Sequence, residues 1–318
     1  MSRFIYLIEL YKKIEPLDLI FVNSLILSFL PIFTSKLSFI LFRNKKIENS
    51  SLILTIISPV LLANGLVLVR DGLAATFFVG TLYYYFEKNN YLLIFMLSFL
   101  FLIREESGLQ AMVVLLIIYF LKQNLSKKIW LIIFGGCVIV ILCYLYQEKI
   151  LILTGGSFFY RKNFVESFLA NNGNGKNGGI YKIQQLNIFF RIPLSMLAFY
   201  LSPLFSLKKI YINNLFIIRW FLYFFMYPII NLFCIGYFTK MLFFIKEDKN
   251  LQFIFFSFLF LLYFVSQFSF QMRHTTMYIP LYYILCSYGM WKRDNNYKQL
   301  KWFTVILTVI LYLGINFI

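Results

Sequence analysis

Three arginines lie at the ends of apolar stretches, and each is followed by an ionisable residue. The short runs are Arg70-Asp71, Arg104-Glu105-Glu106 and Arg273-His274. A guanidinium binds phosphate oxygens through paired hydrogen bonds, and charges inside an apolar chain tend to mark functional positions. The alternative is that arginines at helix ends only extend to lipid headgroups. Because each arginine has an ionisable neighbour, we predict that these residues form a binding site for a phosphate or a sugar.

His274 is the only histidine of the chain. A metal site usually needs several nitrogen, sulfur or carboxylate ligands, so Asp71 or Glu105 would have to complete one around it. The sequence gives no support to a divalent metal, and we expect no cofactor. Hydrogen bonding to a phosphate or a sugar is one role for His274, and a purely structural role is the other. A hydrolase is not indicated, because the chain has no GxSxG motif.

The composition is that of an integral membrane protein. Of 318 residues, 61% are hydrophobic, 21% aromatic and only 14% charged, and the mean hydropathy is +0.77. A soluble domain carries about 25% charged residues, which it needs to cover its surface. These values exclude a soluble enzyme, a disordered chain and a DNA-binding module. The net charge of +17 comes from short basic clusters between apolar stretches, so it indicates cytoplasmic loops and anionic lipid headgroups rather than nucleic acid.

Apolar stretches of helix length recur along the whole chain. A spanning helix needs roughly 20 apolar residues. The candidate spans are 19–42, 51–69, 73–86, 91–103, 107–121, 129–147, 216–239, 251–270, 275–290 and 302–318. We therefore predict an all-α polytopic membrane bundle of about ten transmembrane helices, in which residues 1–318 form a single domain.

The basic residues divide the connecting segments into two sets. Lysines and arginines are frequent in 43–50, 87–90, 122–128, 240–250 and 291–301, whereas 70–72, 104–106 and 271–274 hold one arginine each. By the positive-inside rule the first set is cytoplasmic and the second faces outward. This alternation requires that 186–205, which contains an arginine and two prolines, does not cross. We predict that it is an interfacial helix segment within a long extracytoplasmic loop, residues 148–213.

Four stretches resemble segments of a known family. They are SPVLLANGLVLVRDGLAATFFVGTLYYY, FLIREESGLQAMVVLL, the LSPLF segment around Pro203, and QMRHTTMYIPLYYILCSYG. Together they look like multi-pass bacterial glycosyltransferases of the GT-C type, which act on polyprenyl-linked sugars, and they are also similar to O-antigen and exopolysaccharide polymerases. The resemblance implies that Arg70, Arg104 and Arg273 contact the phosphate of the sugar donor, with Asp71 and Glu105 nearby.

The resemblance also implies a carboxylate that acts as a base. In the family this acid lies in the first outer loop, after a first helix, and no such helix precedes the N-terminal acids here. We therefore expect an N-terminally shortened member, in which residues 1–18 form an amphipathic stretch at the membrane interface. Glu15 and Asp18 are then the predicted catalytic carboxylates, and Asp71 is a third candidate. The alternative is that these acids only mark a solvated helix start.

The expected function is that of a glycosyltransferase in the bacterial cytoplasmic membrane. It would move a sugar from a polyprenyl-phosphate or polyprenyl-diphosphate carrier to a glycan or lipid-linked acceptor during surface polysaccharide assembly. One alternative is a polymerase of O-antigen, capsule or exopolysaccharide repeat units, and another is a transporter or flippase for lipid-linked sugars. A transporter should show inverted repeats and helices broken at the bilayer midplane. Here the charges lie at the predicted outer ends, which favours an enzyme.

Overall fold

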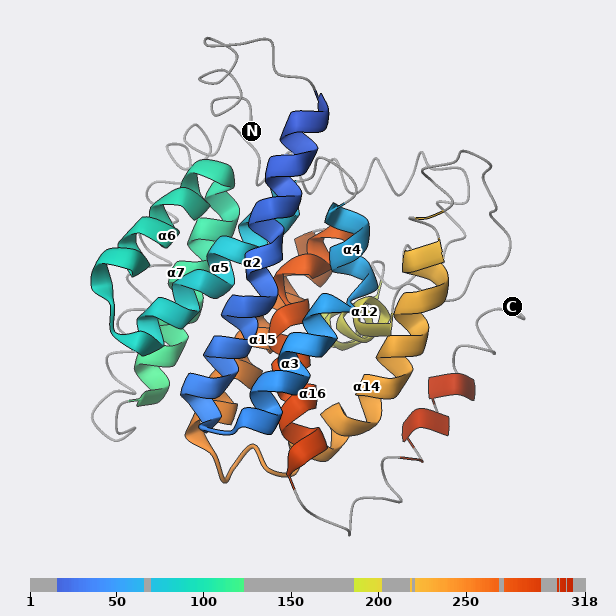
Figure 1. Cartoon of the computed structure of the whole chain (residues 1–318). Coiled ribbons are helices and arrows are strands. Elements are labelled where there is room, and N and C mark those ends of the chain that lie inside the picture. The colour runs from blue at the N-terminus through green and yellow to red at the C-terminus, as the bar shows by residue number, and fades with distance from the viewer. Residues whose placement is uncertain are drawn as a thin grey trace. The chain divides into compact units, whose positions relative to one another are not determined.

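The computed structural model describes residues 16–65, 70–122, 186–201, 218, 221–268, 272–292, 302, 304–306 and 308–310. Helices contain 91% of these residues, and no strand occurs among them (Figure 1). The predicted all-α class is therefore confirmed for the described part of the chain. The predicted span 129–147 lies outside these residues, as does most of the predicted loop 148–213.

The longer helices follow the predicted apolar stretches closely. The elements are α2 (Pro16–Phe42), α3 (Lys45–Ile56), α4 (Pro59–Gly65), α5 (Arg70–Glu87), α6 (Asn90–Ile103), α7 (Glu105–Lys122), α12 (Ile188–Leu201), the π-helix η2 (Phe221–Met226), α14 (Tyr227–Leu242), α15 (Lys249–Phe268), the 3-10 helix η3 (Met272–Met277) and α16 (Ile279–Trp291). Contacts divide the chain into two compact units. The first is Met1–Leu115, Leu201–Leu261 and Gln271–Ile318, and the second is Leu116–Tyr200 and Leu262–Phe270.

Two helices are long and apolar enough to cross a membrane, namely Ile20–Phe42 of α2 and Lys249–Ser266 of α15. The pair α3 and α4 passes the same test as one span bent by 49°. Helix α6 is apolar but only 14 residues long, whereas a straight span needs roughly 20. The described residues thus contain two or three candidate spans, which indicates membrane association.

The first predicted loop is shorter than expected. Residues 45–50, predicted to be loop, form the first half of α3, because Asn44 caps this helix by accepting a hydrogen bond from the Lys46 N–H at 2.9 Å. The predicted span 51–69 is also interrupted. Pro59 has no N–H to donate, so the helix stops at Ile56 and restarts as α4.

A tight helical hairpin joins α5 to α6. The N–H of Asn89 donates to the Tyr84 carbonyl at 3.0 Å and the N–H of Lys88 donates to the Tyr85 carbonyl at 3.3 Å. This is the Schellman pattern, and it places Lys88 in the left-handed region with φ of 64°. The Asn89 side chain then accepts from the Leu92 N–H at 3.2 Å and caps α6.

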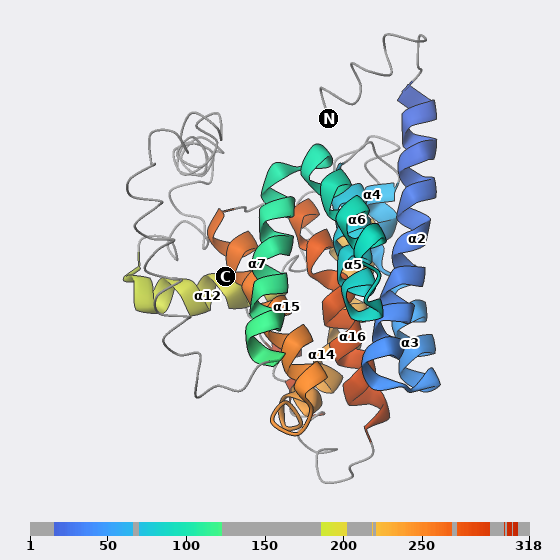
Figure 2. The ribbon, with the colours of Figure 1, turned by 90° about the vertical axis from the view of Figure 1, so that its left-hand side faces the viewer.

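Helix α16 lies in the core of the first unit. Every residue from Ile279 to Gly289 is buried, which is typical of a helix that is apolar all round. It packs against α3 and α14, while α2 packs against α3 and α5 (Figure 2). Buried tyrosines of α16 find polar partners: Tyr282 donates to Asn231 Oδ1 at 2.9 Å and Tyr283 donates to Ser58 Oγ at 3.2 Å.

The chain turns of the first unit gather at two ends. At one end, Asn250 at the start of α15 donates to the Leu41 carbonyl near the end of α2, and Trp291 at the end of α16 donates to Ser50 of α3. We call this the lysine end, and its turns comprise residues 43–46, 88–89, 243–249 and 291–292. The other end comprises the end of α4, the start of α5, the turn from α6 to α7, and η3. We call this end the arginine end. The described turns of each predicted set therefore lie together, whereas residues 123–128 and 293–301 of the basic set lie outside the described residues.

Helix α12 covers most of the predicted interfacial segment 186–205. It belongs to the second unit and contains Pro193 inside its length. Phe189 and Phe190 are exposed, whereas Ser195 is buried and its hydroxyl donates to the Ile192 carbonyl at 3.0 Å. The segment is thus helical, and its place at a membrane interface stays a prediction.

Candidate functional site

A buried ion pair forms where α5 begins and α6 ends. Asp71 lies in the first turn of α5 and is 2% exposed, and Arg104 is the C-terminal cap of α6 and is 8% exposed. The Arg104 Nη1 donates to Asp71 Oδ1, and its Nη2 donates to Glu106 Oε2 of α7 at 3.4 Å. One guanidinium therefore joins the ends of three consecutive helices.

The position of this pair has consequences for both partners. A buried charge is stable only when a partner of opposite sign offsets the loss of hydration. Arg104 is therefore held in place by two carboxylates, and Asp71 is held as the acceptor of a charge-assisted hydrogen bond. This geometry is typical of a structural contact, one that fixes the ends of α5, α6 and α7 relative to one another. The phosphate-binding role of Arg104 and the base role of Asp71 stay predictions.

Hydrogen bonds between uncharged groups join α2, α4 and η3 at the arginine end. Asn64 of α4 donates to Thr276 Oγ1 of η3 at 2.5 Å, and both side chains are fully buried. Two residues of α2 close the same end: Asn23 donates to the Asn64 carbonyl at 3.4 Å and Ser24 donates to the Gly65 carbonyl at 2.8 Å. These bonds attach η3, the segment that carries Arg273 and His274, to α4, and η3 also packs on α5.

The other predicted site residues lie on elements of this end. Arg70 is the first residue of α5 and directly precedes Asp71, Glu105 is the exposed first residue of α7, and Arg273 and His274 are the second and third residues of η3. Asp18 lies in the first turn of α2, the helix whose Asn23 and Ser24 contact α4. Glu15 lies outside the described residues. The structure thus brings the predicted arginine-bearing segments to one end of the first unit.

Two of the residues that hold this end were not predicted. Asn64 is a polar residue inside the apolar run SPVLLANG, and Thr276 follows Arg273 and His274 by two or three positions. An amide within an apolar stretch is itself a signal, because a buried amide needs a hydrogen-bond partner. Its partner in η3 is 212 residues away in sequence. No group of three or more possible metal ligands occurs among the described residues.

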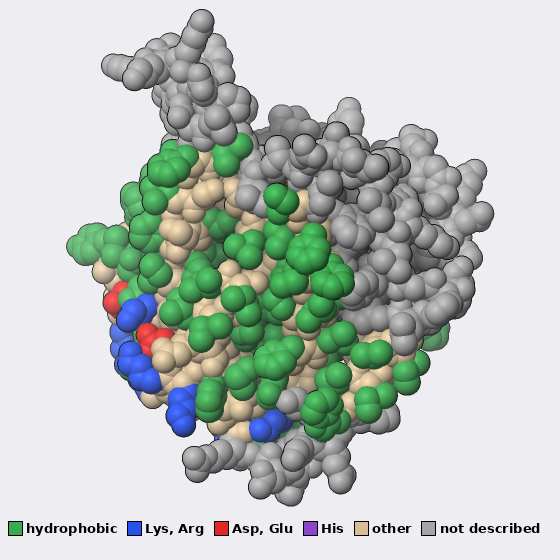
Figure 3. Space-filling model, turned by 45° about the vertical axis from the view of Figure 1, so that its right-hand side comes forward, with side chains coloured by type: hydrophobic (Ala, Val, Ile, Leu, Met, Phe, Trp, Pro, Cys, Tyr) green, Lys and Arg blue, Asp and Glu red, His purple; other side chains and the backbone are tan. Residues whose placement is uncertain are grey.

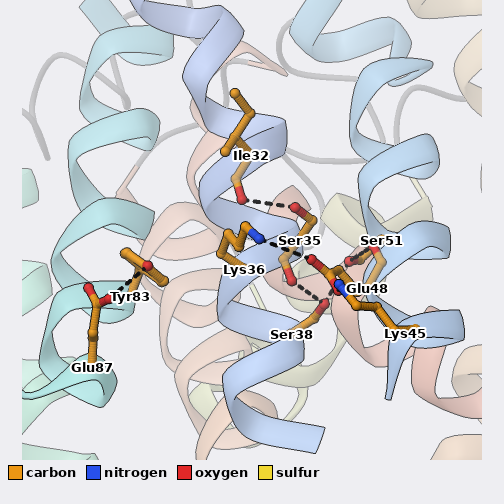
Figure 4. Close-up of polar contacts among 9 residues, drawn as sticks. All are labelled: Ile32, Ser35, Lys36, Ser38, Lys45, Glu48, Ser51, Tyr83 and Glu87. Atoms are coloured by element: carbon orange, nitrogen blue, oxygen red, sulfur yellow. Dashed lines mark hydrogen bonds and ion pairs between the residues drawn. The ribbon is translucent and has the colours of Figure 1, made fainter. Parts of the chain in front are cut away.

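The lysine end holds a second polar cluster that the sequence analysis did not single out (Figure 4). The buried carboxylate of Glu48 in α3 lies 2.8 Å from Lys45 Nζ and 3.5 Å from Lys36 Nζ of α2. Beside it, the hydroxyls of Ser38 and Ser51 are 2.9 Å apart and join the two helices. On α5, Tyr83 donates to Glu87 at 3.1 Å. The contacts of Lys36 with Glu48 and of Ser38 with Ser51 join the antiparallel pair α2 and α3 at the end opposite to Asp71 and Arg104.

No protein-family model, curated protein or solved structure matches this chain.

Proposed function

We propose that this chain is a multi-pass glycosyltransferase of the bacterial cytoplasmic membrane. It takes a sugar from a polyprenyl-phosphate or polyprenyl-diphosphate carrier and transfers it to a glycan or a lipid-linked acceptor. The observation that carries the proposal is the gathering of arginine-bearing helix ends at one end of an apolar helical unit, braced by the buried contact of Asp71, Arg104 and Glu106.

Within this proposal the arginines divide into two roles. Arg104 is engaged with Asp71 and Glu106, so it positions the start of α5, where Arg70 lies. The bond between Asn64 and Thr276 positions η3, and with it Arg273 and His274. Arg70 and Arg273 are therefore the arginines proposed to bind the donor phosphate, because a guanidinium matches two phosphate oxygens at once.

The proposed reaction is a substitution at the anomeric carbon of the donor sugar. A carboxylate removes the proton of the acceptor hydroxyl, the hydroxyl oxygen bonds to the anomeric carbon, and the bond from that carbon to the phosphate oxygen breaks. The leaving phosphate takes the electron pair, and Arg70 and Arg273 stabilise its charge. Asp18, in the first turn of α2, is the proposed base, with Glu15 as the alternative.

The proposed topology follows from the distribution of charge. Lysine-rich turns remain on the cytoplasmic side, so the lysine end faces the cytoplasm and the arginine end faces outward. The spans predicted from the sequence, about ten in number, then cross the membrane in alternating directions between these two faces. The polyprenyl chain of the donor reaches the arginine end from the bilayer, between apolar helices.

The proposal is tested by following transfer from a labelled donor. The full-length chain in proteoliposomes receives polyprenyl phosphates that carry radiolabelled hexoses, with a membrane lipid extract of the producing cells as the acceptor source. We expect release of free polyprenyl phosphate and labelled product. The variant Arg273→Lys keeps the charge but lacks the planar guanidinium, which can donate to two phosphate oxygens at once. It should lower the transfer rate by about 10-fold or more, since a charge-assisted hydrogen bond contributes roughly 1.5–3 kcal/mol.

The matched control is Arg43→Lys at the lysine end, an exposed arginine in the turn from α2 to α3. This variant should transfer at the wild-type rate. Equal rates for wild type, Arg273→Lys and Arg43→Lys would contradict the phosphate role of Arg273, and no release of polyprenyl phosphate from any donor would contradict the proposed activity.

A further inference from the structure

Two basic side chains in the turn from α2 to α3 make no ion pair within the described residues. They are Arg43, which follows α2, and Lys46, in the first turn of α3, and both are exposed. Other lysines of this end do have carboxylate partners: Lys45 and Lys36 contact Glu48, and Lys292 contacts Glu247 at 3.3 Å. The turn therefore holds two positive charges that remain available to an anion.

Aromatic rings hold the basic side chains of this turn in place. The Lys46 ammonium lies 5.1 Å from the centre of the Trp291 ring, and the Arg43 guanidinium lies 6.0 Å from that of Phe39. Cations at such distances are attracted to the ring face. The indole N–H of Trp291 donates to Ser50 Oγ at 2.5 Å, so the ring itself is fixed on α3. Trp291 is 41% exposed, and tryptophan is enriched where a protein meets lipid headgroups.

The backbone of Arg43 is consistent with a functional charge at this position. Its N–H donates to the Phe39 carbonyl at 2.8 Å and its φ is 51°, which is the left-handed cap at the end of a helix. Glycine adopts this conformation at no steric cost, whereas a side chain costs free energy there. The position is nevertheless occupied by a cation, as is the equivalent cap at Lys88.

We infer that Arg43 and Lys46, together with the Trp291 ring, bind the phosphate of an anionic phospholipid at the lysine end. The surroundings fit an acyl-chain ligand, because the Lys and Arg side chains lie along one margin of a mainly hydrophobic face (Figure 3). Exposed apolar residues of α2 and α3, such as Phe29, Ile32 and Ile53, belong to the same helices. A phosphate bound at the turn thus has an apolar surface beside it for its acyl chains. This site lies at the opposite end from the proposed transferase site and does not depend on that activity.

The test is a binding titration on the full-length protein in a neutral detergent. Phosphatidylglycerol labelled on its acyl chain is the probe, and fluorescence anisotropy reports binding. Each basic residue near an anionic lipid surface contributes about fivefold in affinity, so Arg43→Gln/Lys46→Gln should weaken binding about 25-fold. Raising the salt concentration should weaken binding to the wild type and change binding to the variant little, because exposed charges are screened.

The matched control removes two charges from other turns of the same end, by Lys88→Gln/Lys249→Gln, and should weaken binding much less. The single variant Arg43→Gly suits the left-handed backbone, so it should lose about fivefold in affinity without a lower unfolding temperature. Equal losses in the two double variants would overturn the site in favour of a general effect of net charge. Competition by inorganic phosphate as effective as that by unlabelled phosphatidylglycerol would overturn the lipid as ligand.

Discussion

Asp71 and Arg104 are separated by 33 residues in the sequence, yet they form the most deeply buried ion pair among the described residues. Each could be singled out from the sequence, because a charge at the end of an apolar stretch is unusual. Their pairing was not predictable, because it depends on how α5 packs on α6. In the sequence Asp71 directly follows Arg70, and the structure adds Arg104, at the end of α6, as a hydrogen-bond partner of Asp71.

Removing the charge of Asp71 should destabilise the protein strongly. In Asp71→Asn the Arg104 guanidinium stays buried without its Asp71 partner, and breaking a buried pair costs about 3–5 kcal/mol. Urea unfolding of the protein in detergent measures this loss. The control Glu105→Gln alters an exposed carboxylate that makes no ion pair within the described residues, and it should change the free energy of unfolding by less than about 0.5 kcal/mol.

A second variant separates charge from packing at this position. The double variant Asp71→Asn/Arg104→Gln removes both charges. Its loss in the free energy of unfolding should therefore be smaller than the sum of the losses in the two single variants. Strict additivity of the two free-energy changes would show that the pair does not interact in solution.

The cap at Lys88 offers a change that should stabilise the protein. Lys88 holds φ of 64° in the Schellman turn between α5 and α6. Lys88→Gly removes the steric cost of that conformation and should raise the free energy of unfolding by about 0.5–1 kcal/mol. Lys88→Ala keeps the cost and serves as the comparison in the same unfolding experiment. A glycine variant no more stable than the alanine variant would show that the turn is not strained.

At the scale of elements, helices were easier to predict than their boundaries. The apolar stretches located α2, α5, α6, α7 and α15 to within a few residues, because side chains facing lipid or the core must be apolar along the whole helix. The start of α3 was missed, although Asn44 and Glu48 are a capping residue and a first-turn acid. The break before Pro59 was missed as well, and proline was its signal. Hydrophobicity alone predicts neither the start of α3 nor the break before Pro59.

The contact between α14 and α16 depends on a glycine. A Cβ added to Gly289 would lie 2.1 Å from the Tyr237 carbonyl oxygen, so the two helices would have to separate. Gly289→Ala should therefore lower stability by about 1–3 kcal/mol, as overpacking of a core does. At Gly65 an added Cβ would meet the Leu27 side chain at 3.5 Å, an ordinary contact, so Gly65→Ala is the matched control. Thermal unfolding of both variants compares them, and equal midpoints would contradict the close approach of α14 and α16.

At the scale of the molecule, charge patterning predicted which turns lie together. Among the described residues, the lysine-rich turns meet at one end of the first unit, and the arginine-bearing turns meet at the other. This grouping was accessible from the sequence because Lys and Arg are unevenly distributed among the segments that connect the apolar stretches. The hydrogen bonds that hold each end were not accessible, since residues such as Asn64 and Thr276 are joined only by the packing of distant helices.

The proposed transfer at an outward-facing arginine end depends on the two ends facing opposite sides of a membrane. The most direct measurement labels single cysteines, Lys246→Cys in the turn between α14 and α15 and Glu105→Cys at the start of α7, in a variant without the native cysteines; both positions are exposed. A membrane-impermeant maleimide is added to intact cells and to inverted membrane vesicles. We predict that Glu105→Cys reacts only in intact cells and Lys246→Cys only in inverted vesicles. Reaction of both positions from the same side would contradict the account.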